Sequence, residues 1–110
     1  QSDIHMFNLP NGARILSGEL VHVALGGSTT ASVGHAAYTN AAGTTVALDV
    51  DEYKAAAAST SITTVDIAAT AALGRNSVVD ANGTGIPVTV SVAGANGTGL
   101  IELKMLYVID

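Results

Sequence analysis

The chain of 110 residues has no cysteine and no tryptophan, and only 12% of its residues are charged. Without cysteine it can form neither disulfide bonds nor thiolate metal sites. Nine acidic residues against four basic ones give a net charge of −5, so we expect neither DNA nor RNA as a partner. No apolar run approaches the roughly 18 residues of a membrane span, and no export signal is expected at the start, so we expect no membrane partner.

Small residues dominate what is present. Hydrophobic residues make up 48% of the chain, while aromatic residues make up only 4%. At this length the chain is expected to form one domain, residues 1–110, that buries about 60 to 70% of its unfolded surface. A surface with few charges and many small side chains favours packing against neighbouring subunits.

Turn residues interrupt the chain at short intervals, for example at Asn11-Gly12, Gly26-Gly27 and Asn82-Gly83. Short runs rich in β-branched residues lie between these turns, a pattern typical of a sandwich or barrel. The sequence predicts an all-β, antiparallel, jelly-roll-like β-sandwich of about eight strands. The predicted strands are residues 4–7, 14–25, 29–35, 44–48, 61–67, 76–79, 86–93 and 100–109.

The last two predicted strands flank Asn96-Gly97, a dipeptide typical of a tight hairpin turn. Pairing them across that turn predicts one dry face and one wet face. On the dry face, Val88, Val90 and Val92 are expected opposite Met105, Leu103 and Ile101. On the wet face, Thr89 and Ser91 are expected opposite Lys104 and Glu102.

Local patterns predict three further features. Asp49 and Glu52 have the spacing of a capping box before an alanine run, so residues 49–58 are expected to form one short crossover helix. Alternation around Val21, Val23 and Leu25 predicts that these three side chains share a buried face. Gly18 is expected to mark a bulge or bend, and residues 68–73 are expected to be a loop.

The candidate chemical sites have simpler structural explanations. The carboxylates of Asp49, Asp51 and Glu52 lack the glycine and the remaining ligands of a calcium loop. The histidines, His5, His22 and His35, are far apart in the sequence, and no serine lies in a nucleophile motif. Asn82-Gly-Thr84 and Asn96-Gly-Thr98 match a glycosylation acceptor, yet they are also ordinary turn sequences. We therefore expect no catalytic residue, no metal, no cofactor and no enzyme activity.

The stretch Met6-Phe-Asn-Leu-Pro-Asn-Gly-Ala-Arg-Ile-Leu-Ser-Gly-Glu-Leu20, followed by Leu25-Gly-Gly-Ser-Thr-Thr-Ala-Ser-Val-Gly34, resembles the small structural proteins of tailed bacteriophages. The Tyr and alanines of residues 49–58 and the final strand near Tyr107 extend this resemblance. The group is that of capsid cement, staple or decoration proteins. The resemblance implies a jelly-roll subunit that binds the outside of an assembled capsid and cements neighbouring subunits of the major capsid protein.

The same resemblance implies a homodimer or homotrimer on the outer surface of the virion, made in the cytoplasm of the bacterial host. Residues 1–9 are expected as an extended N-terminal arm that pairs with a neighbour, with Ile4, His5, Met6, Phe7 and Leu9 as interface residues. Residues 29–35 and 100–109 are expected as edge strands and as further interface segments. Alternative functions are a head-to-tail connector, a tail structural protein, or a receptor-binding or glycan-binding module.

Overall fold

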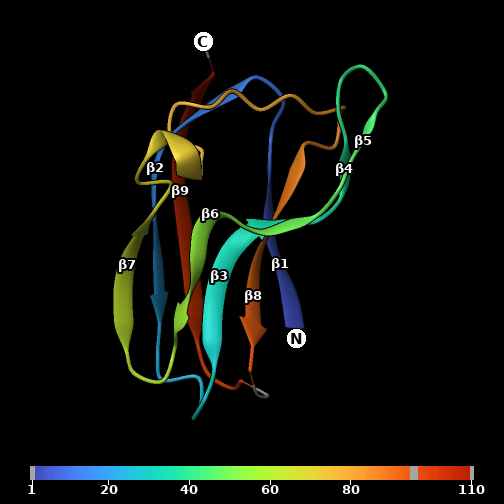
Figure 1. The fold of residues 1–110 in the computed structure, drawn as a ribbon. Coiled ribbons are helices and arrows are strands. Elements are labelled where there is room, and N and C mark those ends of the chain that lie inside the picture. The colour runs from blue at the N-terminus through green and yellow to red at the C-terminus, as the bar shows by residue number, and fades with distance from the viewer. Residues whose placement is uncertain (1, 95–96, 110) are drawn as a thin grey trace.

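A computed structural model describes residues 2–94 and 97–109 (Figure 1). Nine strands and one 3-10 turn lie in these residues. The strands are β1 (Ser2–Leu9), β2 (Ala13–His22), β3 (Thr30–His35), β4 (Tyr38–Thr39), β5 (Thr45–Val46), β6 (Asp49–Ala58), β7 (Thr63–Ile67), β8 (Ile86–Ala93) and β9 (Ile101–Ile109), and the turn is η1 (Ala71–Leu73). No helix in the described part is long and apolar enough to cross a membrane.

The strands form an all-β antiparallel sandwich of the predicted jelly-roll type. β1 pairs with β8, β2 with β7, β3 with β6, and β4 with β5. This nested order of pairs is that of a jelly roll, in which one long antiparallel hairpin folds over on itself. One sheet has the order β1-β8-β3-β6 and the other has the order β7-β2-β9. The short β4–β5 hairpin projects from one corner (Figure 1). β9 is an addition to the wound hairpin, because it pairs with the free side of β2.

The core lies between the two larger sheets. β8 and β3 supply valines from one sheet, and β2 and β7 supply branched aliphatic residues from the other. Its largest fully buried apolar side chains are Leu9, Ile15, Leu20, Val33, Ile67, Val88 and Val90. Each such side chain contributes about 1.5 to 3 kcal/mol when it leaves water.

The predicted crossover helix is wrong. Residues 49–58 form strand β6, which pairs with β3 from His35–Asp49 to Thr30–Ala58. The register shifts twice along this pair, so β6 follows β3 irregularly. Pairing with a neighbouring strand satisfies the backbone that the alanines alone would place in a helix, because tertiary contacts override propensity.

The predicted hairpin between residues 86–93 and 100–109 is also wrong. β8 lies between β1 and β3 in one sheet, while β9 belongs to the other sheet, so their connection crosses the sandwich. Thr89 and Ser91 are not on a wet face, because both are buried and the Ser91 hydroxyl donates to Asp3 Oδ1 at 2.7 Å. Asn96, in the predicted turn, lies outside the described residues.

Other local predictions fare differently. Of the predicted buried face only Leu25 is buried, while Val21 and Val23 are half-buried; at this end of β2 the buried residues are Leu20 and His22. The β2–β9 register shifts between Ile15 and Ser17, which places a bulge close to Gly18. Predicted strand 76–79 lies along residues 12–15 through backbone hydrogen bonds and a bridge from Val78 to Arg14, but it is not a full strand. The predicted loop 68–73 contains η1.

The N-terminal segment forms part of the fold. β1 pairs with β8 from Ser2–Val92 to Leu9–Ile86, so residues 2–9 are an edge strand of their own subunit. β9 is an edge strand, as predicted for residues 100–109, but β3 is central, so the same prediction for residues 29–35 is wrong. The four edges of the two larger sheets are β1, β6, β7 and β9.

Candidate interaction surface

The three histidines occupy separate strands and do not converge. His5 is exposed on β1, and its Nε2 donates to Asn8 Oδ1 at 2.6 Å. His22 and His35 are buried, and the Nδ1 of each donates to the carbonyl oxygen of the following residue, at 2.8 and 2.9 Å. Among the described residues, no three His, Asp or Glu side chains form a group that could hold a metal ion.

Asp49, Asp51 and Glu52 form an acidic segment at the start of β6, beside His35 on β3. A hydrogen bond with Asp51 lowers the pKa of Asp49, and the same contact raises the pKa of Asp51. Partial burial, followed by the contact with Asp49, raises the pKa of Glu52. The three pKa shifts therefore arise mainly from contacts of the carboxylates with one another and from partial burial.

The first glycosylation-like motif forms a turn. Asn82 Oδ1 accepts hydrogen bonds from the backbone N–H of Thr84 at 3.3 Å and from its hydroxyl at 2.9 Å. This Asx-type arrangement is the ordinary role of Asn-Gly-Thr in a tight turn. The second motif begins at Asn96, outside the described residues.

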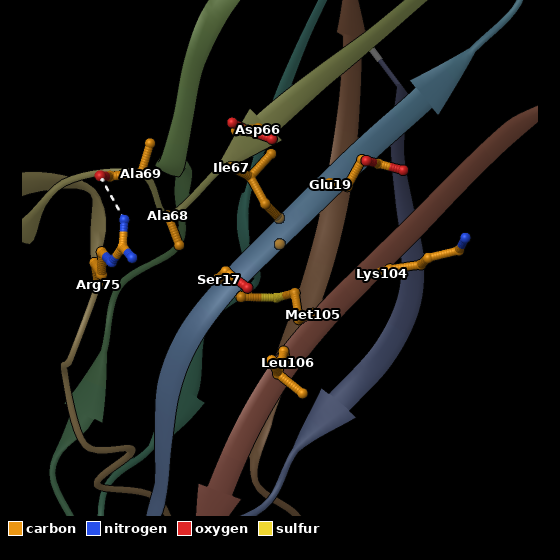
Figure 2. A pocket seen from close by; sticks show the side chains of 11 residues that line it. Ser17, Glu19, Asp66, Ile67, Ala68, Ala69, Arg75, Lys104, Met105 and Leu106 are labelled. Atoms are coloured by element: carbon orange, nitrogen blue, oxygen red, sulfur yellow. Dashed lines mark hydrogen bonds between the residues drawn. The ribbon is translucent and has the colours of Figure 1, made fainter.

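A shallow depression of about 670 Å³ lies on the β7-β2-β9 sheet (Figure 2). Gly18 and Ile67 both line it, and they lie so close that a Cβ at residue 18 would be 2.5 Å from Cγ1 of Ile67. Four charged side chains line it, and they are Glu19, Asp66, Arg75 and Lys104. Arg75 is turned toward one side, where it donates to the Ala69 carbonyl oxygen at 3.4 Å.

The lining of this depression combines charged groups of both signs with one hydroxyl group. Its two acidic and two basic side chains balance, and Ser17 is the lining residue with a hydroxyl group. None of the three histidines lines it, so Ser17 has no imidazole base there. In comparisons with known proteins, no family model, curated protein or solved structure matches this chain.

The predicted interface residues of β1 fall into two groups. Ile4 is 40% exposed and His5 is exposed, so both are accessible to a partner. Met6 and Phe7 are half-buried and pack against the core. Leu9 is 0% exposed because its side chain packs in the hydrophobic core. Its prediction as an interface residue is therefore wrong.

The largest concentration of exposed apolar side chains is at the C-terminal end of β9. We define the apolar end as Val78, Tyr107, Val108 and Ile109, all exposed. Val108 and Val78 lie opposite Arg14 on either side of β2, so the three side chains share the outer face of the sheet. Tyr107 and Ile109 lie opposite buried Ile15 and Ala13, so their side chains are on the inner face of the sheet. Both side chains are nevertheless exposed.

The predicted interface strand 100–109 includes Tyr107, Val108 and Ile109, but the sequence did not single out these three residues and did not point to Val78. All five residues 105–109 are apolar, and such a run taken alone is typical of a strand buried on both faces. A sandwich covers only one face of each sheet, so the outward residues of such a run must be exposed. That conflict between an unbroken apolar run and a one-sided core was the available signal.

Proposed function

We propose that this protein is a structural component of a tailed-phage virion that binds the outside of the assembled capsid and cements neighbouring subunits of the major capsid protein. The observation that carries the proposal is the apolar end. Its exposed apolar side chains lie on both faces of one end of the sheet, and exposed apolar groups gathered in this way are typical of a protein–protein contact. The resemblance of residues 6–34 to phage decoration proteins supplies the identity of the partner.

The architecture supports this role. An antiparallel sandwich presents whole sheet faces and strand edges to a neighbouring surface, and a standard contact buries about 1,200 to 2,000 Å². A subunit that binds only the assembled lattice lowers the free energy of that state and of no other. The mechanism is non-covalent and needs no catalytic group.

The exposed part of β1 is a second candidate contact. Ile4 and His5 are accessible on the outer edge of β1, whose inner side is already paired with β8. A capsid segment could add to this edge as a further strand. Removal of residues 1–7 is a poor test of this contact, because it would also uncover β8, so point substitutions of Ile4 and His5 are preferable.

The first test is the ratio of this chain to the major capsid protein in purified particles, by quantitative mass spectrometry. A ratio of the same order as the capsid protein supports a shell component. A few copies per particle would favour a connector or tail protein, and absence from particles would refute a virion role.

The apolar end can be tested by one matched pair of substitutions. Ile109→Ser removes an isoleucine of the apolar end that is 64% exposed, and Ile62→Ser removes one that is 76% exposed between β6 and β7. We expect Ile109→Ser to weaken binding to undecorated capsids about tenfold or more, and Ile62→Ser to leave it unchanged. Equal effects of the two substitutions would show that the apolar end is not the contact.

A further inference from the structure

The free edge of β9 presents a defined set of backbone groups. The backbone N–H of Val23 donates to the Leu100 carbonyl oxygen at 3.1 Å, in the same register that pairs His22 with Ile101. Because backbone direction alternates along a strand, Leu100, Glu102 and Lys104 turn their N–H and C=O groups toward β2. Ile101, Leu103 and Met105 therefore turn theirs outward, where no described strand pairs with them.

The side chains along this edge form a pattern that is complementary to itself. The outer face carries, in order, Leu100, Glu102, Lys104 and Leu106, and the inner face carries Ile101, Leu103 and Met105. Read in the opposite direction, apolar and charged positions coincide again, with Glu102 and Lys104 exchanged and Ile101 and Met105 exchanged. Leu100 is 65% exposed and Leu106 is 59% exposed, so the two ends of the pattern are accessible apolar groups.

We propose that two copies of this chain associate through their β9 edges, antiparallel about a two-fold axis at Leu103. In this register each Glu102 lies opposite Lys104 of the second copy, and each Leu100 lies opposite its Leu106. On the inner face, Leu103 meets its own copy and Ile101 meets Met105. The outward backbone groups of Ile101, Leu103 and Met105 then pair with one another, joining the two three-stranded sheets into one.

Neighbouring registers are disfavoured by charge. Moving the two-fold axis to residue 102 places Glu102 opposite Glu102, and moving it to residue 104 places Lys104 opposite Lys104. Like charges directly opposite each other in a sheet are destabilising, whereas opposite charges are favourable. Among axes on residues 102 to 104, only Leu103 gives an acid–base pair on both sides. An unprotected edge strand is also a common site of association between chains.

Charge exchange tests this register directly in the full chain. Sedimentation equilibrium at low salt should show a dimer for the natural sequence. Glu102→Lys and Lys104→Glu should each raise the dimer dissociation constant about tenfold or more, because each creates two like-charge contacts. The double variant, Glu102→Lys with Lys104→Glu, restores opposite charges across the axis and should recover most of the affinity.

The oligomeric state and the effects of the charge exchanges distinguish the proposed dimer from other assemblies. A natural chain that remains monomeric, or that forms a trimer, would overturn the proposal. Dimers that tolerate both single exchanges would overturn the register. Lys104 also lies opposite Glu19 in its own chain, so circular dichroism must show that Lys104→Glu still folds.

Cross-linking provides a second, independent measurement. The chain has no cysteine, so introduced thiols are unique. Chains carrying Glu102→Cys, mixed with chains carrying Lys104→Cys, should form mixed disulfide dimers on mild oxidation, since directly opposite residues lie about 4.5 to 5.5 Å apart at Cα. Both substitutions are at exposed positions.

The matched control is Leu106→Cys alone. In the proposed register, two copies of residue 106 are separated by about 20 Å along the paired strands, six residues at about 3.4 Å each, so they should not cross-link. Cross-linking of Leu106→Cys to itself, or no mixed dimer from residues 102 and 104, would refute the register. The dimer is measured without capsids, so its failure would be distinct from a failure of the proposed capsid binding.

Discussion

Gly34 lies in the interior of β3, directly beneath the start of β6. A Cβ at this position would overlap the Asp49 carbonyl oxygen and lie 2.5 Å from the Val50 carbonyl carbon. Both atoms belong to the backbone, so no side chain can rotate away. The pairing of β3 with β6 at this point therefore depends on the absence of a side chain at residue 34.

We expect Gly34→Ala to lower the free energy of unfolding by about 1 to 3 kcal/mol, the usual cost of overpacking. Urea denaturation measures this directly. Gly83→Ala is the matched control, because a Cβ there meets nothing within 4 Å. The control should change stability by less than about 0.5 kcal/mol. A tolerated Gly34→Ala would mean that β6 does not approach β3 so closely.

Glu52 makes a pH-dependent contribution to the free energy of unfolding. Its pKa is raised above the ordinary value of 4.5 by partial burial and by Asp49, against the opposing attraction of His35. The folded state therefore holds the proton more tightly than the unfolded state does. The stability associated with this proton is present below the ordinary value and is lost as pH rises through the folded value.

We expect Glu52→Gln to gain stability relative to the natural chain as pH rises from about 4 to about 7, because the glutamine cannot ionise. The gain should stay below about 1 kcal/mol, since solvent screens a largely accessible carboxylate. Urea denaturation at several pH values gives the difference. Asp49 titrates with the opposite sign, so only the difference between the two proteins is informative. A difference that shrinks with rising pH would contradict the assignment.

At the scale of elements, β6 is a strand despite four consecutive alanines. Ala58 lies opposite Thr30 of β3 and is exposed, so its substitution reports on the local conformation. In a strand, Ala58→Thr should raise the free energy of unfolding by about 0.2 to 1 kcal/mol through a cross-strand Thr–Thr pair. In a helix the same change would lower it, because Thr is a poorer helix former than Ala.

Thermal and urea denaturation of Ala58→Thr measure the sign of this effect. Ala58→Gly is the control, and it should destabilise in either conformation because Gly adds backbone freedom to the unfolded chain. Stabilisation by Thr together with destabilisation by Gly would identify the strand. Destabilisation by both substitutions would instead support the predicted helix over residues 49–58.

The sequence predicted where most strands lie, but it did not predict which strands pair. Alternation and turn residues located β1, β2, β3, β7, β8 and β9, because these signals are local. The partner of β8 is set by β1 and β3, which are distant in the chain. Ser91 shows the difficulty, since a hydroxyl typical of a wet face is instead covered by Asp3. The apolar end depends on the same long-range pairing of β9 with β2.

At the scale of the whole molecule, the proposed cement function depends on the binding equilibrium between free subunits, undecorated capsids and decorated capsids. Binding that is confined to the assembled lattice stabilises it by RT ln(1 + [L]/Kd) per site, about 2.7 kcal/mol when the free subunit is at 100 times Kd. Capsid stability should therefore depend on the concentration of this protein.

We expect the disruption temperature of undecorated capsids to rise with added protein and to keep rising logarithmically above Kd, as measured by differential scanning calorimetry with light scattering. Ile109→Ser should shift this curve to higher concentration, while Ile62→Ser should not. The capsid protein in its unassembled form should show no change in melting temperature. Equal stabilisation of assembled and unassembled forms would mean that the subunit recognises one chain and not the junction between neighbours, and the cement mechanism would then be wrong.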